Sequence, residues 1–263
     1  MLRPRIIPCL LVDNNRLVKT VNFKDPKYVG DPLNAVKIFN EKSVDELMFI
    51  DISASRENKE PNYDLIEKVA TECRMPLCYG GGIKTVEQAQ KVLGLGVEKV
   101  SLSSKALEDP SLLQKLADEI GSQSVVVTLD VKKKRLGSGY QIYTMNGKQK
   151  SKYKLDDYIR LCQDNGAGEL VINSIDKDGM MKGYDLELIT QVKQQVSIPL
   201  TILGGAGSLE DFHQLYQKYG LIGMAAGSYF VFKGKFRAVL ISYPSAEEKR
   251  NILNITESSK GRL

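Results

Sequence analysis

The amino-acid sequence predicts an α/β fold, a single (β/α)8 barrel (TIM barrel) made of two half-barrel repeats. Eight units, each a short apolar strand followed by an amphipathic helix, fit the 263 residues, and this alternation is typical of a parallel sheet covered by helices. Barrels of this class use about 250 residues as one domain, and no linker interrupts the chain. Glycine and serine motifs also recur at a fixed offset. We therefore expect one domain over residues 1–263.

The first predicted strand, at residues 6–12, precedes an unusually long polar segment. This segment, at residues 13–30, exceeds the usual connection of about 2–6 residues and is predicted to be a loop that covers an active site. Asp31 and Pro32 then open a helix, because Asp31 can accept a hydrogen bond at the N-cap and proline suits the first turn.

The later elements follow from apolar runs of strand length and from helical periodicity. Strands are predicted at 47–52, 76–79, 99–102, 125–131, 170–175, 199–203 and 222–226. Helices are predicted at 63–73, 85–95, 110–119, 155–164, 185–195 and 209–219, with a helical terminal part through residue 253. Residues 140–144 and the turn at Asn146 and Gly147 predict a hairpin on the fifth connection.

Composition excludes several classes of protein. The 37 basic and 32 acidic residues are mixed along the chain, which argues against a nucleic-acid partner, and the mild positive excess suits a phosphorylated small molecule. No apolar stretch approaches 18 residues and the start does not resemble a signal peptide, so no membrane association and a cytoplasmic location are expected. The four cysteines lack metal-ligand spacing and His213 is the only histidine, so no metal or other cofactor is expected. His213 is predicted to be structural, and residues 132–135 a solvated basic loop.

An internal repeat relates the two halves of the chain. Gly81 and Gly205 each follow a strand and lie 124 positions apart (205 minus 81), and residues 101–104 precede residues 225–228 by the same offset. Asp51 and Asp176, at the ends of two further strands, are 125 positions apart and are expected at the barrel mouth. One half-barrel is therefore expected to occur twice.

Glycines and small hydroxyl residues at strand ends favour phosphate binding, because backbone N–H groups there can contact an oxyanion. A tight turn without a ligand is the alternative. One such element in each half predicts two phosphate sites on opposite sides of the mouth. The predicted phosphate-binding residues are Gly81, Gly82, Ser103, Ser104, Gly204, Gly205, Gly227 and Ser228.

The strand at 125–131 delivers Asp130 to its carboxyl end, which makes Asp130 the first candidate for catalysis. Capping of the following turn is the alternative. General acid/base chemistry usually needs two groups that flank the substrate, but Leu11 stands where the repeat predicts the partner carboxylate. Asp13 lies on the same strand face as Leu11, although a solvated position in the loop is as reasonable.

Four strands begin beside a charged residue: Arg5, Glu46, Lys99 and Glu169. Strand starts meet at the amino-terminal rim of a barrel, so these two positive and two negative groups can pair across its axis. A structural plug and a gate for a small molecule both remain open on this pattern.

The motifs at 5–10, 28–32, 45–47, 80–83, 121–127, 173–179 and 204–207, in this order, resemble the cyclase subunit family of imidazole glycerol phosphate synthase. The resemblance covers residues 3–232 and implies that a glutaminase docks on the amino-terminal face and sends ammonia through the barrel to a bisphosphorylated substrate. It implies that Arg5, Glu46, Lys99 and Glu169 form the ammonia gate and that Lys19 is a catalytic lysine on a mobile loop. Asp130 matches one of two catalytic aspartates, and Asp178 and Gly179 join the phosphate sites.

Leu11 stands where the family has its other essential aspartate, and Met180 replaces a hydroxyl residue. These departures, with the motifs at 27–32, 77–85 and 230–244, most resemble a paralogous branch that serves surface-polysaccharide and flagellin-sugar synthesis. There a barrel conducts ammonia to a separate ATP-using amidotransferase that converts an N-acetyl group to acetamidino. We expect this role first, a histidine-pathway cyclase as the alternative, and a non-enzymatic scaffold as a third possibility.

Overall fold

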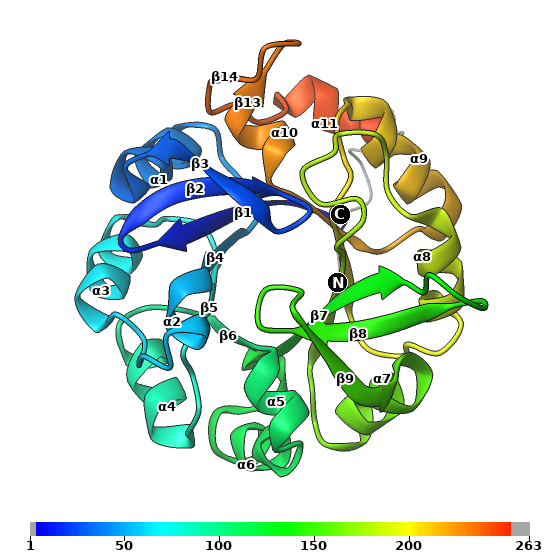
Figure 1. The fold of residues 1–263 in the computed structure, drawn as a ribbon. Coiled ribbons are helices and arrows are strands. Elements are labelled where there is room, and N and C mark those ends of the chain that lie inside the picture. The colour runs from blue at the N-terminus through cyan, green and yellow to red at the C-terminus, as the bar shows by residue number, and fades with distance from the viewer. Residues whose placement is uncertain (1–3, 254–263) are drawn as a thin grey trace, which may run out of the picture.

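A computed structural model describes residues 4–253 of the chain. Eight parallel strands close into a barrel that helices surround on the outside (Figure 1). The closed order is β1 (Arg5–Asp13), β4 (Leu47–Asp51), β5 (Leu77–Gly80), β6 (Lys99–Leu102), β7 (Val125–Lys133), β10 (Glu169–Ser174), β11 (Leu200–Leu203) and β12 (Gly223–Ala226), which pairs again with β1. The predicted (β/α)8 barrel is thus confirmed. The single domain of residues 1–263 stays a prediction, because its ends lie outside the described residues.

Seven longer helices cover the barrel and lie close to their predicted positions: α1 (Pro32–Glu41), α3 (Tyr63–Glu72), α4 (Val86–Gly94), α6 (Ser111–Ile120), α7 (Leu155–Asp164), α8 (Leu186–Lys193) and α9 (Leu209–Tyr219). They form because each presents an apolar stripe to the strands, and residues such as Phe39, Tyr158 and Phe212 are fully buried beneath them. Helix α1 begins as predicted, since the Asp31 carboxylate accepts a hydrogen bond from the Asn34 backbone N–H.

Short helices at the carboxyl ends of strands were not predicted. These are α2 (Ile52–Arg56), α5 (Ser104–Glu108) and α10 (Ser228–Val231), with a 3-10 turn, η1 (Ser122–Ser124), before β7. Each is too short to show helical periodicity in the sequence.

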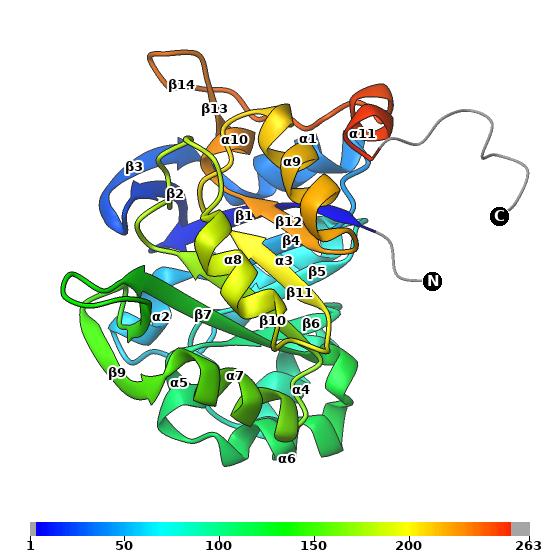
Figure 2. The same ribbon diagram turned by 90° about the vertical axis from the view of Figure 1, so that its right-hand side faces the viewer.

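The polar segment at 13–30 is a hairpin, so its prediction as a loop was wrong. Strands β2 (Arg16–Val21) and β3 (Lys24–Gly30) extend β1 in antiparallel pairing. The physical reason is the alternation within β2, where Leu17 is buried beside exposed Arg16, as expected for a strand with one face on the core. Figure 2 shows this hairpin at the same end of the barrel as the hairpin that follows β7.

The second hairpin confirms the prediction for the fifth connection, with strands β8 (Tyr140–Thr144) and β9 (Gln149–Lys154). Strand β7 runs further than predicted, so Lys132 and Lys133 lie in a strand instead of a solvated loop. The Lys133 ammonium pairs with Glu187 at 2.5 Å. Each half-barrel therefore begins with a nine-residue strand and an antiparallel hairpin, as expected for a repeat.

The terminal part is not wholly helical, which corrects another prediction. Strands β13 (Phe232–Lys233) and β14 (Ala238–Val239) form a small ribbon before helix α11 (Ala246–Ile252). Between ribbon and helix, the Tyr243 hydroxyl donates to the Ile6 carbonyl at 2.8 Å and joins the terminal segment to β1. His213 of α9 contacts the Ile252 carbonyl at 3.0 Å, which fits its predicted structural role. Among residues 4–253, no helix has the length and apolar character needed to cross a membrane.

Candidate functional site

A cavity of about 450 Å³ occupies the barrel mouth at the carboxyl ends of the strands. This end carries the chemistry in enzymes with this fold. Ten predicted site residues line the cavity: Leu11, Lys19, Asp51, Gly81, Gly82, Ser103, Ser104, Asp130, Asp178 and Gly227. Residues more than 200 positions apart in the chain therefore contribute to one site.

Asp130 lines this cavity, on the strand where the sequence placed it. The Asn173 side-chain amide donates to the Asp130 carboxylate at 2.9 Å. Burial raises the pKa of Asp130 to about 7, against the hydrogen bond from Asn173, which lowers it. Asp130 can therefore exist as acid and as base near neutral pH, which is the condition for general acid/base catalysis.

Leu11 lines the same cavity and supplies no carboxylate. Asp13 does not replace it, because its carboxylate pairs with Arg56 at 2.9 Å and Asp13 is not among the residues that line the cavity. Within the described residues, strand β1 thus presents an apolar side chain where a second acid would have to act.

Lys19 lies in strand β2, so the prediction of a lysine on a loop needs correction. Its side chain is buried, and its ammonium contacts both oxygens of Asp178 at 2.8 and 2.9 Å. Asp178 was predicted to bind phosphate, but a carboxylate repels a phosphate and here it neutralises Lys19. Both residues line the cavity, where they form a buried ion pair.

In the first half-barrel, the predicted phosphate-binding residues gather at one side of the cavity. Gly81 has a φ of +120°, and a Cβ at this position would lie 2.4 Å from the Asp51 carbonyl oxygen. Glycine is thus required by the close approach of two backbones. The lysines Lys84 and Lys105 line the same side, so a phosphate there would meet positive charge.

The equivalent residues of the second half lie partly apart from the cavity. Gly205 has a φ of +119°, almost equal to that of Gly81, and a Cβ there would lie 2.2 Å from the Gly183 carbonyl oxygen. Of the second set, Gly227 lines the cavity, whereas Gly179, Gly204, Gly205 and Ser228 are not among the described residues that line it. Arg237 of the terminal ribbon donates to the Gly179 carbonyl and to the Ser228 hydroxyl.

The two aspartates related by the repeat differ in their surroundings. Asp51 is buried at the cavity and caps α2, accepting hydrogen bonds from the Ser53 and Ala54 backbone N–H groups at 2.9 and 3.0 Å. Asp176 accepts a hydrogen bond from the Lys133 backbone N–H at 2.9 Å and is not among the residues that line the cavity. The two aspartates therefore occupy equivalent positions in the repeat, but of the two only Asp51 lines the cavity.

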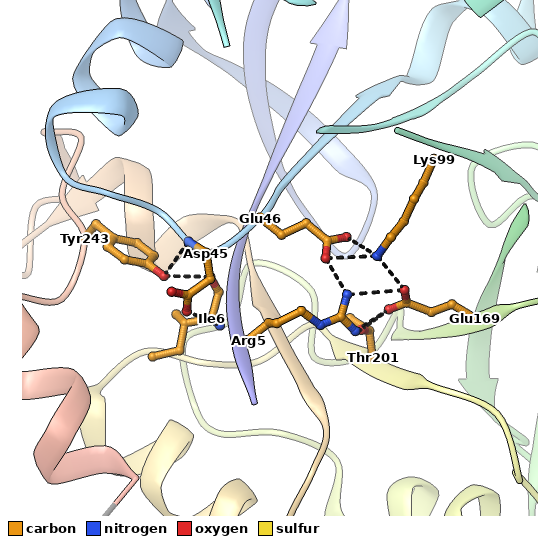
Figure 3. Close-up of polar contacts among 8 residues, drawn as sticks. All are labelled: Arg5, Ile6, Asp45, Glu46, Lys99, Glu169, Thr201 and Tyr243. Carbon is orange, nitrogen blue, oxygen red and sulfur yellow. Dashed lines mark hydrogen bonds and ion pairs between the residues drawn. The ribbon is translucent and has the colours of Figure 1, made fainter. Parts of the chain in front are cut away.

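At the opposite rim, the four charged residues form a closed ring across the barrel axis (Figure 3). Arg5 contacts both Glu46 and Glu169, and the Lys99 ammonium lies 3.0 and 2.9 Å from the same two carboxylates. Burial alone would raise the pKa of Glu169, but the hydrogen bond and charge of Arg5, followed by Lys99, lower it well below its usual value. The pKa values of Arg5 and Lys99 are raised by the same pairing, because the carboxylates outweigh the effect of burial, so Arg5, Lys99 and Glu169 stay charged at neutral pH.

Between ring and cavity, the inward side chains are mostly apolar. Ile7, Cys9, Met48, Cys78, Val126, Val171, Leu203 and Ala225 pack as one cluster inside the barrel. Burial raises the pKa of the Cys9 thiol to about 12, so Cys9 is a neutral thiol and not a nucleophile at physiological pH. The ring, the apolar interior and the polar mouth thus follow one another along the axis.

Sequence reasoning missed Asn173, which lines the cavity, and Arg237, which contacts two of the predicted phosphate-binding residues. Asn173 begins the motif at 173–179. It is a polar residue within the apolar run 170–175, and a polar residue in such a run indicates a buried position with a specific hydrogen-bond partner. Arg237 had no comparable signal, because its position depends on the unpredicted ribbon.

Residues 5–237 match the model of the family described as histidine biosynthesis protein. The chain belongs to this family. A relative from Vibrio vulnificus, named provisionally as an imidazole glycerol phosphate synthase subunit, is 57% identical over 97% of this chain and 98% of its own. A Pseudomonas aeruginosa relative with the same provisional description is 52% identical over 94% of this chain and 98% of its own.

A third relative of this chain is the imidazole glycerol phosphate synthase subunit HisF of Lactococcus lactis. It is 41% identical over 82% of this chain and 84% of its own length. These findings confirm the expected resemblance to HisF. They favour the alternative of histidine synthesis over the acetamidino-sugar role that the sequence analysis placed first, since none of these three relatives is described as acting on a sugar.

Proposed function

We propose that this chain is the ammonia-using synthase subunit of a complex of the imidazole glycerol phosphate synthase type. The observation that carries the proposal is the closed ring of Arg5, Glu46, Lys99 and Glu169 beneath an apolar interior that leads to Asp130. An apolar passage favours neutral ammonia over ammonium or other ions, because burying an unpaired charge is costly. A glutaminase on the amino-terminal face would release its ammonia at the ring.

At the mouth, Asp130 would take a proton from the nitrogen nucleophile as it adds to a phosphorylated substrate, and Lys19 would stabilise negative charge that develops there. The glycine and serine elements of the two half-barrels are proposed to hold the phosphates of this substrate. The match of residues 5–237 to the family model, and relatives that carry this enzyme's name over most of their length, support the proposal.

Leu11 favours a second candidate function. A barrel with one carboxylate at its mouth can conduct ammonia without completing a cyclisation, since the loss of one member of an acid/base pair costs about 10²–10⁴ in rate. In this case the chain would deliver ammonia to a separate ATP-using amidotransferase that converts an N-acetyl sugar to its acetamidino form.

One assay distinguishes these functions. The purified chain is given the bisphosphorylated ribulosyl precursor of histidine synthesis with an excess of ammonium at pH 8, and imidazole glycerol phosphate is followed. The first proposal expects turnover that the substitution Asp130→Asn lowers by about 10²–10⁴ and that Leu11→Asp increases. Absence of turnover in both the wild type and Leu11→Asp would contradict the first proposal and leave sugar amidination as the function to test.

A further inference from the structure

The terminal ribbon brings a cation to the predicted phosphate-binding residues of the second half-barrel. Arg237 lies in the turn between β13 and β14, and its Nη2 atom donates to the Gly179 carbonyl and to the Ser228 hydroxyl, the latter at 3.3 Å. Both partners belong to the residues that the sequence analysis assigned to phosphate binding. Arg237 thus occupies the place where the second phosphate was expected.

Arg237 has only neutral side-chain and backbone partners there. Within the part of the chain that the structure describes, its guanidinium contacts a carbonyl and a hydroxyl, and the ion pairs found among these residues do not include it. A guanidinium carries five N–H donors in a planar fork, so most of them are left for a ligand. A half-buried cation without a carboxylate partner is suited to an anion.

A second cation, from the hairpin of β2 and β3, contacts Arg237. The Lys27 ammonium of β3 donates to the Arg237 carbonyl at 3.0 Å. It also lies 5.0 Å from the centre of the buried Phe232 ring, and the Arg237 guanidinium lies 5.2 Å from the same centre. Stacking on one ring restrains both side chains, so the two positive charges are held in place before a ligand binds.

The charge of this arrangement selects the class of ligand. Two positive groups match the two negative charges of a phosphomonoester, whereas a carboxylate would compensate only one of them. The planar fork of arginine can bind two oxygens of one phosphate. Strand β3 and the ribbon therefore add two positive charges to the backbone N–H groups that the glycines of the second half-barrel offer.

We propose that Arg237 is a binding residue for the phosphomonoester end of the substrate in the second half-barrel, and that Lys27 supports it. Gly179 and Ser228 hold the guanidinium until the phosphate takes over its donors. This inference rests on the proposed function, because it assumes that the mouth binds a phosphorylated substrate, and it names the residue that recognises one end.

Calorimetric titration with inorganic phosphate, and with glycerol 2-phosphate as a simple phosphomonoester, tests this role. The wild type is expected to bind two equivalents of phosphate, one in each half. Arg237→Gln is expected to weaken one of them by at least about tenfold, as the loss of a charge-assisted hydrogen bond predicts, and Arg237→Lys to weaken it less. Lys235→Gln, an exposed lysine on the same ribbon, is the matched control and should change both constants less than twofold.

The possible outcomes separate this inference from the proposed function. Two sites of wild-type affinity in Arg237→Gln would overturn the role of Arg237 but leave phosphate binding intact. A wild type that binds neither probe would overturn both proposals. Circular dichroism shows whether Arg237→Gln is folded, and if it is not, the Arg237→Lys titration decides, since unchanged affinity for both phosphates would contradict bidentate recognition.

Discussion

At the scale of single residues, Asp130 differs from Asp178 and Asp51 in its hydrogen-bond partner, which is a neutral side-chain amide instead of an ammonium or the N-terminus of a helix. Asp178 is paired with Lys19, and Asp51 accepts backbone hydrogen bonds at a helix start. Asp130 accepts a hydrogen bond from Asn173 and no charge compensates its burial. A proton therefore binds Asp130 at a higher pH than it binds an ordinary aspartate.

This pKa makes stability depend on pH in a defined direction. The folded chain keeps the Asp130 proton up to about pH 7, whereas the unfolded chain releases it near the ordinary aspartate pKa of 3.8. Between these values the folded state binds more protons, so the free energy of unfolding falls as pH rises from about 4 to about 7. Asp130→Asn removes this contribution and should gain about 1–3 kcal/mol relative to the wild type between pH 4 and pH 8.

Urea denaturation at several pH values measures this difference, because all other groups are shared by the two proteins. A difference between wild type and Asp130→Asn that stays constant over this range would show that the carboxylate is ionised in the folded state well below pH 7.

At the scale of elements, the turns after β5 and β11 show how the repeat is kept. Gly81 and Gly205 adopt φ values of +120° and +119°, and in both cases the backbone of a neighbouring loop occupies the space of a side chain. The neighbours differ, with the Asp51 carbonyl in the first half and the Gly183 carbonyl in the second. The half-barrels thus share a backbone geometry that different contacts enforce.

Gly205→Ala is expected to destabilise the fold by more than about 2 kcal/mol. The new Cβ would lie 2.2 Å from the Gly183 carbonyl oxygen, and alanine disfavours a positive φ. Gly94→Ala is the control, because a Cβ there would have no heavy atom within 4 Å and alanine is the better helix residue by about 0.5–1 kcal/mol. Chemical denaturation compares both variants with the wild type, and a Gly205→Ala protein of unchanged stability would mean that the turn can move away freely.

At the scale of the whole molecule, the ring at the amino-terminal rim joins strands from both half-barrels. Arg5 and Glu46 come from the first half near β1 and β4, Lys99 begins β6, and Glu169 begins β10 of the second half. Each cation contacts both carboxylates, so one substitution leaves the charges of the others unbalanced. The ring therefore contributes to barrel closure whether or not it also gates ammonia.

Lys99→Met tests both roles of the ring. It leaves one cation between two buried carboxylates and should destabilise the fold by about 2–4 kcal/mol at pH 7. The hydrogen bond and charges that lower the pKa of Glu169 from 4.5 to about 2 stabilise the fold fully above about pH 4.5 and are lost as the pH falls to about 2, so the gap between wild type and variant should shrink between these two pH values. Lys68→Met, at an exposed lysine of α3, is the control for the loss of a surface charge.

The functional part of this prediction needs the glutaminase partner. With glutamine as the nitrogen source, Lys99→Met is expected to lower product formation more than glutamine hydrolysis. With ammonium added directly, the loss should be smaller. Equal losses under both conditions would speak against passage of ammonia through the ring and would favour a scaffold role.

The eightfold alternation, the repeat and the charged strand starts could be predicted because they depend on local patterns. Apolar runs of strand length and amphipathic periods are written in consecutive residues, and strand ends of a parallel barrel must meet at common rims. The helix at 155–164 and the strand at 99–102 were placed with their observed bounds for this reason. The hairpin at 16–30 and the terminal ribbon could not be placed, since short strands of mixed polarity form only against a partner.

The sequence by itself determined that this chain folds as a barrel with glycine and serine at the mouth, Asp130 without a partner acid at Leu11, and four charges at the opposite rim. Only the tertiary structure decided which side chains meet. Lys19 and Asp178 are 159 positions apart and Arg237 and Gly179 are 58 apart, and no periodicity connects such residues. Their contacts exist because barrel closure brings distant strand ends together. Which side chains then pair depends on their charge and on the room available between neighbouring residues.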